Sequence, residues 1–181
     1  MALIDMDGVQ LEITSVSAPV ESGAPQRQPV VFLHEGLGSV AMWRDWPAAV
    51  CQATGRSGWV YSRRGYGQSS PAPEKLPPDY LHREAWDMLP ALLDRLGAAR
   101  PVLLGHSDGA SIALLYASRF PVAACIVMAP HVMVEDVSIE SIAQARDAFQ
   151  DKSNGLRQRL ARYHADVDGA FWQWNDAWLN P

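Results

Sequence analysis

The stretch Gly105-His106-Ser107-Asp108-Gly109 has the residue types and spacing to present a serine hydroxyl for nucleophilic attack. It follows the apolar residues 102–104 and precedes a segment that begins with small residues. A Gly-x-Ser-x-Gly turn between a strand and a helix can hold its serine in a strained conformation with the hydroxyl exposed, because the two glycines carry no side chains that would collide. We therefore expect Ser107 to act as a nucleophile.

Acyl transfer by a serine also needs two backbone N–H groups that stabilise the developing oxyanion. Asp108, the residue after the serine, would supply one of them, at the positive end of the helix that begins there. The segment 34–39, His-Glu-Gly-Leu-Gly-Ser, follows the apolar run 30–33, in the place where the second donor is expected. Gly36 is the expected donor because its backbone can turn inward freely.

The serine hydroxyl needs a neighbouring base to take its proton. His131 directly follows the apolar residues 124–128, at the carboxyl edge where sites form in α/β folds, and Glu135 and Asp136 come soon after. His131 is therefore a candidate base, and the alternative is that it caps the strand or lines the pocket. The remaining histidines are expected to orient loops or to lie on helices: His34, His82, His106 and His164.

Alternating strands and helices must position these residues. The chain is expected to open with an antiparallel hairpin around Asp7-Gly8, followed by a loop at 22–28. Strands are then expected at 30–33, 58–62, 102–104 and 124–128, and helices at 42–53, at 80–96 and after Ser107. This order predicts an α/β fold with a mostly parallel, doubly wound sheet that has helices on both faces.

After His131 the pattern changes to helices alone, at 139–150, 156–164 and 171–179. We expect them to lie above the sheet. Phe171, Trp174 and Trp178 are spaced to form one aromatic face, whose favoured role is packing onto the sheet, with lining of an acyl pocket as the alternative.

Three motifs in order resemble the α/β-hydrolase fold family, in particular its small esterase, lipase and carbon–carbon bond hydrolase branch. They are the His-x-Gly-x-Gly loop at 34–38, the Arg-Gly-Tyr-Gly-Gln-Ser turn at 64–69 and the serine turn at 105–109. The resemblance implies a hydrolase core at 1–131, a helical cap at 132–181 and hydrolysis of carboxylic esters through an acyl-enzyme on Ser107.

The sequence departs from the family pattern at two positions, where Glu35 replaces a usual Gly and Ser62 replaces a common Asp. Both departures leave the backbone roles possible. A serine instead of an aspartate at 107 argues against the haloalkane dehalogenase and epoxide hydrolase branches. Carbon–carbon bond hydrolysis, or acyl transfer to an acceptor other than water, stays open.

In this family the acid and the histidine follow the nucleophile on two later strands. Those strands are absent from this sequence, so we expect a C-terminally incomplete sheet with an exposed hydrophobic edge at 124–128. Such an edge favours a homo-oligomer or a second, complementing chain. The alternative function is accordingly a catalytically silent fragment or binding subunit.

Composition excludes several other classes of function. A net charge of −5 and an isoelectric point near 5.4 argue against nucleic acid as a partner, and no uncharged apolar stretch reaches the length of a membrane span. Cys51 and Cys125 fit a reduced, cytoplasmic protein. Because we find neither metal-ligand spacing nor a phosphate loop, we expect no metal and no cofactor, and a small-molecule ester or acyl substrate.

Overall fold

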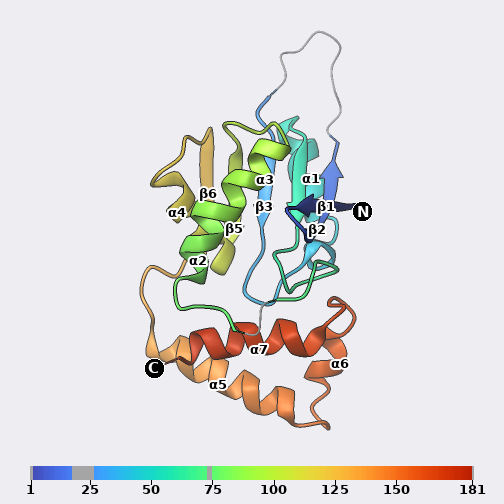
Figure 1. The fold of residues 1–181 in the computed structure, drawn as a ribbon, viewed down its shortest axis with the longest axis vertical. Helices are drawn as coiled ribbons and strands as arrows, with labels where there is room; N and C mark the ends of the chain where they lie inside the picture. Colours follow the sequence, from blue (N-terminus) through green and yellow to red (C-terminus); the bar gives the residue numbers. More distant parts are fainter. Residues whose placement is uncertain (1, 18–26, 73–74, 181) are drawn as a thin grey trace.

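A six-stranded sheet in the order β1-β2-β4-β3-β5-β6 forms the centre of the fold (Figure 1). The structure, a computed structural model, describes residues 2–17, 27–72 and 75–180. The strands are β1 (Ala2–Met6), β2 (Val9–Val16), β3 (Val30–Leu33), β4 (Gly58–Tyr61), β5 (Val102–His106) and β6 (Ala124–Met128). β1 and β2 are antiparallel to their neighbours, and the pairs of β3 with β4, β3 with β5 and β5 with β6 are parallel. The mostly parallel sheet predicted from the sequence is confirmed.

The helices cover both faces of this sheet (Figure 1). They are η1 (Val40–Trp43), α1 (Trp46–Thr54), α2 (Tyr80–Arg83), η2 (Glu84–Met88), α3 (Leu89–Arg95), α4 (Asp108–Ala117), α5 (Asp136–Gln150), α6 (Leu156–Leu160) and α7 (Val167–Trp178). Alternate residues of β3 point to opposite faces: Val31 packs in a core with α3 and α4, and Phe32 packs with Cys51 of α1. This alternation explains why the sequence of β3 is apolar throughout.

The opening hairpin forms as predicted, since β1 pairs with β2 through the turn at Asp7 and Gly8. Both turn residues have positive φ, 54° and 89°, the conformation that suits the right-handed twist of the two strands. Residues 22–26 of the predicted loop lie outside the described residues, and residues 27–29 have no regular secondary structure.

Two predicted helices are less regular than the sequence pattern indicates. The segment 42–53 divides into η1 and α1 at Arg44, which has φ 53°, and Pro47 lies in the first turn of α1. The segment 80–96 contains the wider turn η2, in which the N–H of Leu89 donates to the carbonyl of Glu84. Pro90 follows directly and has no N–H to donate, so a regular α-helical ladder could not continue there.

Helices α5, α6 and α7 lie together at one end of the sheet (Figure 1). Their own small core includes Phe149 and Phe171, whose rings stack with centroids 3.8 Å apart. The division into a core at 1–131 and a cap at 132–181 remains our proposal.

Strand β6 lies at the edge of the sheet and, among the residues that the structure describes, pairs with β5 alone. Ile126 at its middle is 47% exposed. The segment that follows carries further exposed apolar side chains: Val132, Met133, Val134 and Val137. No helix in the described ranges combines the length and the hydropathy needed to cross a membrane.

Candidate active site

Ser107 occupies the sharp turn between β5 and α4. Its backbone has φ 54° and ψ −118°, a conformation that non-glycine residues rarely adopt, and its N–H donates to the carbonyl of Met128 at 2.9 Å. The flanking glycines are required by close packing, because a Cβ on Gly105 would collide with the backbone of Gly109, and one on Gly109 with the backbone of Leu33. The local sequence therefore has the geometry expected of a strained strand-to-helix turn.

His131 is the residue that the fold brings to the Ser107 hydroxyl. Its Nε2 lies 3.0 Å from Ser107 Oγ, although the two residues are 24 positions apart. Ala129, with φ 49°, forms the turn after β6 that directs the chain toward the serine. The His131 ring also contacts the edge of the Trp178 indole, with centroids 4.8 Å apart.

The backbone of His131 is held by Ser111, one turn along α4 from the serine. The Ser111 hydroxyl accepts from the His131 N–H and donates to the His131 carbonyl, both at 2.9 Å. Ser111 is 4% exposed, so both bonds are shielded from water. Sequence reasoning missed this residue, because a serine in a small-residue helix carries no signal of its distant partner.

Within the described residues, no carboxylate contacts the His131 ring. Glu135 precedes α5 and Asp136 begins it, and both side chains are exposed. Asp108, the only acidic residue lining the cavity at Ser107, accepts instead from the Tyr80 hydroxyl at 2.8 Å. The described part of the structure therefore brings together a serine and a histidine and adds no third, acidic member of a triad.

Asp108 has two separate structural roles. Its buried side chain faces Tyr80 and also lies 3.7 Å from the guanidinium of Arg63. Its backbone is the first residue of α4, where an N–H has no partner within the helix. The role of this N–H as an oxyanion donor stays a prediction.

Gly36 lies in a tight turn closed by the bond from the Gly38 N–H to the Glu35 carbonyl, 3.0 Å long. The indole of Trp174 from α7 packs directly against Gly36, and any Cβ at this position would collide with it. The third helix of the predicted cap therefore closes onto the loop expected to hold the oxyanion.

Arg63 holds the loop at 34–38 in place through hydrogen bonds. Its guanidinium donates to the carbonyls of His34 at 2.6 Å and Glu35 at 3.1 Å. The Arg63 N–H donates to Nε2 of His34, so the proton of the neutral ring is on Nδ1, which donates to the Glu35 carbonyl at 2.7 Å. Burial, and then the charge of Arg63, lower the pKa of His34 well below its usual value. His34 is thus a neutral structural residue that orients its own loop.

Ser62 replaces an Asp that is common in the family, and a carboxylate from another strand lies beside it. Glu12 of β2, which is 1% exposed, accepts from the Ser62 hydroxyl at 2.6 Å and from the Gln68 N–H at 3.0 Å. Ser62 in turn accepts from the Val40 N–H at 2.9 Å. Glu12 therefore ties the turn at 64–69 to the sheet, a role that sequence reasoning did not assign to it.

His164 links the cap to the loop at 34–38 and to the turn at 64–69 through hydrogen bonds. Its Nδ1 accepts from the Gly67 N–H and its Nε2 donates to the Leu37 carbonyl, each at 3.0 Å. The side chain is 3% exposed, and this burial lowers its pKa. His164 is thus neutral and lies outside the cavity at Ser107. His106 instead faces Glu35, with Nδ1 and Oε2 3.7 Å apart.

A cavity of about 260 Å³ opens beside Ser107. Its lining comprises Ser107, Asp108, His131, Val137, Ser138, Ser141, Ile142, Trp174 and Trp178. Trp174 and Trp178 line the cavity, whereas Phe171 packs inside the cap and not onto the sheet, which was the role favoured from the sequence. The buried Nε1 of Trp178 has no hydrogen-bond partner among the described residues.

No group of three or more His, Cys, Asp or Glu side chains in the described segments is placed to hold a metal ion. Cys51 and Cys125 are both free thiols.

Residues 28–179 match the family model described as alpha/beta hydrolase fold, and the chain belongs to this family. Over 129 residues it is 36% identical to "Epoxide hydrolase A" of Mycobacterium tuberculosis, a match that covers 68% of this chain and 37% of that protein. Over 159 residues it is 27% identical to "Bifunctional esterase/perhydrolase DCH" of Acinetobacter calcoaceticus, covering 83% and 55% respectively. The chain therefore spans about half, or less, of the length of these curated relatives.

Solved structures are similar in fold. A carboxylesterase structure from Nitrososphaera gargenis superimposes with a TM-score of 0.70 at 18% identity, over 99% of this chain and 73% of that one. The thermophilic esterase of Thermogutta terrifontis gives a TM-score of 0.69 at 15% identity, over 98% and 70%. These likenesses support the α/β-hydrolase fold of this chain, and its relatives include esterases and an epoxide hydrolase.

Proposed function

We propose that this protein is a serine hydrolase of carboxylic esters that forms an acyl-enzyme on Ser107. The observation that carries the proposal is the 3.0 Å contact between Ser107 Oγ and His131 Nε2. The backbone of this serine has a strained φ of 54°. A strained serine beside an imidazole nitrogen is the arrangement in which a hydroxyl can lose its proton as it attacks.

In the proposed reaction, Ser107 Oγ attacks the ester carbonyl carbon and His131 Nε2 takes the hydroxyl proton. The N–H groups of Gly36 and Asp108 stabilise the oxyanion that develops. When the intermediate collapses, the ester C–O bond breaks and His131 gives its proton to the departing alcohol. Water then attacks the acyl-enzyme with the same help from His131, which releases the carboxylic acid and restores Ser107.

The residue at 107 favours an ester over an epoxide as the substrate, despite the epoxide hydrolase relative. Attack on an epoxide carbon by a carboxylate gives an ester, which water can hydrolyse. Attack by Ser107 would give an ether, which water does not cleave under such conditions. Carbon–carbon bond hydrolysis or acyl transfer to another acceptor would use the same acyl-enzyme and stays possible within this proposal.

The second candidate is a catalytically silent fragment or binding subunit. It is favoured by the absence, in the described part of the chain, of a carboxylate against the His131 ring. Without an acid to orient and charge-stabilise the imidazole, activation of Ser107 would be weaker than in a full triad.

A fluorophosphonate probe distinguishes the two candidates. Labelling is followed by mass spectrometry of the peptide that contains Ser107, and turnover of p-nitrophenyl acetate is measured in parallel. We expect labelling that Ser107→Ala abolishes and that His131→Ala slows by about 10²- to 10⁴-fold, the range for loss of a general base. His82→Ala, at an exposed histidine whose ring meets the Trp86 ring in a T-shaped contact, serves as the matched control and should label normally. No labelling of Ser107 in the unmodified chain would favour the silent subunit.

A further inference from the structure

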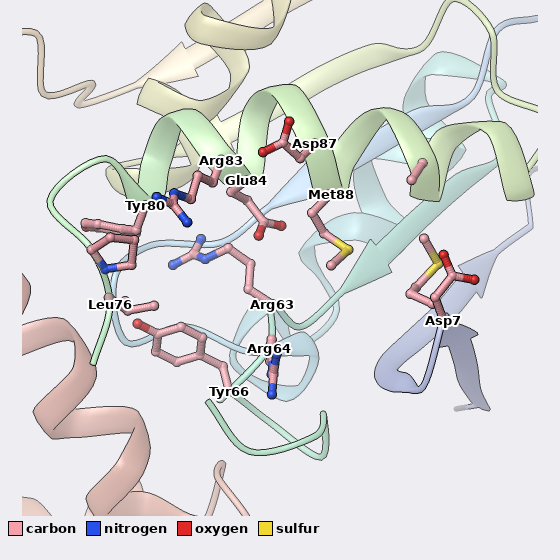
Figure 2. A pocket seen from close by; sticks show the side chains of 13 residues that line it. Asp7, Arg63, Arg64, Tyr66, Leu76, Tyr80, Arg83, Glu84, Asp87 and Met88 are labelled. Atoms are coloured by element: carbon pink, nitrogen blue, oxygen red, sulfur yellow. The ribbon is translucent and has the colours of Figure 1, made fainter. Parts of the chain in front are cut away.

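A second and larger cavity, of about 440 Å³, lies away from Ser107 (Figure 2). It is bounded by the β1–β2 turn, by the turn at 63–66 and by the continuous helix α2–η2–α3, and it shares no lining residue with the cavity at Ser107. Its volume falls within the roughly 300–1,000 Å³ typical of small-molecule sites. The proposed ester hydrolysis leaves this cavity without a role.

The charged side chains in the lining of this cavity balance one another. They are three arginines, Arg63, Arg64 and Arg83, and three carboxylates, Asp7, Glu84 and Asp87. A lining without net charge attracts neither cations nor anions over a distance, and a charged ligand would lose hydration on entering the cavity. The balance of charge therefore favours an uncharged ligand.

Arg63 is the buried charge in the wall of the cavity. It is 5% exposed, and its guanidinium donates to the carbonyls of His34 and Glu35. Figure 2 shows this guanidinium between the Glu84 carboxylate and Tyr66. A cationic ligand at this point would be repelled by Arg63, and an anionic ligand would compete with the Glu84 carboxylate for it.

Tyr66 supplies a polar group that lacks a partner. Its side chain is 2% exposed, and its hydroxyl has no hydrogen-bond partner among the described residues. The ring is held in place, with the guanidinium carbon of Arg63 5.1 Å and the His164 ring 6.0 Å from its centroid. Figure 2 shows the hydroxyl end directed toward Leu76 and Tyr80, which also line the cavity. Burial raises the pKa of Tyr66, so the hydroxyl keeps its proton at neutral pH and is a donor.

The rest of the lining offers mainly apolar surface. Its apolar members are Met6, Leu76, Pro77, Met88 and Ala91. The hydroxyl of Tyr80 is already engaged, because it donates to Asp108 at 2.8 Å. A single unpartnered donor in a charge-balanced and largely apolar cavity matches a ligand with one hydrogen-bond acceptor on a hydrocarbon body.

We propose that this cavity binds a small uncharged molecule with one carbonyl oxygen, of the class of an aromatic ketone. The oxygen accepts from the Tyr66 hydroxyl, and the hydrocarbon part packs against Met6, Leu76 and Met88. Binding gives the buried hydroxyl the partner that it lacks and removes apolar surface from water.

Titration of the ¹⁵N-labelled protein at pH 7.5, followed by ¹H–¹⁵N correlation spectra, tests the class of ligand. The probes are acetophenone, benzylamine and benzoate, which are similar in size and differ in charge. We expect acetophenone to bind at least about tenfold more tightly than either charged probe, because the charged probes lose more hydration. No binding of acetophenone at millimolar concentration, or equal or tighter binding of a charged probe, would overturn the proposal.

The variant Tyr66→Phe tests the hydrogen bond, with toluene as a probe that has no acceptor. The substitution should weaken acetophenone binding about two- to tenfold, the scale of one neutral hydrogen bond, and leave toluene binding unchanged. Tyr163→Phe, the same change at a half-buried tyrosine outside the lining, should leave both unchanged. Acetophenone binding that is equally strong in Tyr66→Phe and the unmodified protein would refute the role of the hydroxyl.

Two further measurements test the location and the missing partner. Ala91→Trp fills the cavity from an exposed position and should abolish acetophenone binding, whereas unchanged binding would place the ketone elsewhere and overturn the proposal. The urea midpoint of Tyr66→Phe without ligand should equal or exceed that of the unmodified protein, and a lower midpoint would show that the hydroxyl already has a partner. Acetophenone is not an ester, so these results are independent of any reaction at Ser107.

Discussion

The hydroxyl of Ser111 bridges the backbone N–H and carbonyl of His131, with both bonds 2.9 Å long. Ser111 lies on α4, four residues after Ser107, whereas His131 follows β6. The helix that begins at the candidate nucleophile thus also determines the position of the candidate base.

Replacing Ser111 with Ala should misplace His131. Both backbone groups lose their partner, and we expect a loss of about 1–3 kcal/mol in the free energy of unfolding together with roughly tenfold slower labelling of Ser107 by a fluorophosphonate. Urea unfolding and labelling rates measure the two effects. Ser141→Ala is the control, because Ser141 lines the same cavity but its hydroxyl bonds to its own helix at Val137. Equal labelling rates in the two folded variants would refute the positioning role.

Protonation of His164 should loosen the cap. Burial lowers its pKa in the folded state, so below about pH 6.5 the unfolded chain takes up a proton that the folded chain resists. The free energy of unfolding therefore falls as the pH falls from about 6.5 toward the lowered pKa, by up to about 1.4 kcal/mol per pH unit for this one proton.

The variant His164→Asn isolates this effect. The amide oxygen of Asn can still accept from the Gly67 N–H but does not titrate. Urea unfolding between pH 7.5 and 5.5 should show a shallower loss of stability in the variant, which also removes the small lowering of the His34 pKa by His164. Parallel curves for the two proteins would contradict the prediction.

Gly36 and Trp174 should be energetically coupled. Gly36→Ala places a methyl group against the Trp174 indole and should lower the free energy of unfolding by about 1–3 kcal/mol, the usual cost of overpacking. Trp174→Ala should remove most of that penalty, so a double-mutant cycle measured by urea unfolding should give a coupling energy above about 0.5 kcal/mol. Strict additivity would mean that the helix α7 does not close on this loop.

Strand β6 should mediate self-association or the docking of a complementing chain. Within the described ranges it pairs on one side only, and Ile126 is 47% exposed. An unpaired apolar edge favours the addition of another strand. Light scattering of the chain at high concentration should reveal oligomers, and Ile126→Lys should shift them toward the monomer. A well-behaved monomer across the concentration range would argue against the proposal.

The sequence alone determined the fold and the local geometry at Ser107. Continuous apolar runs at residues 30–33 and 102–104 require a sheet covered on both faces, and the glycines at 105 and 109 permit a strained turn. These features depend on near neighbours in the chain, so periodicity and turn chemistry suffice to predict them.

Only the tertiary structure decided which distant groups meet. The sequence offered His131 as one candidate base among alternatives, and the packing of β6 beside β5 brings its Nε2 to Ser107. The contribution of Glu12 to the turn at 64–69 and the closure of Trp174 on Gly36 likewise join segments more than 50 residues apart. Such contacts depend on how the elements pack against one another, and no local pattern in the sequence encodes that packing.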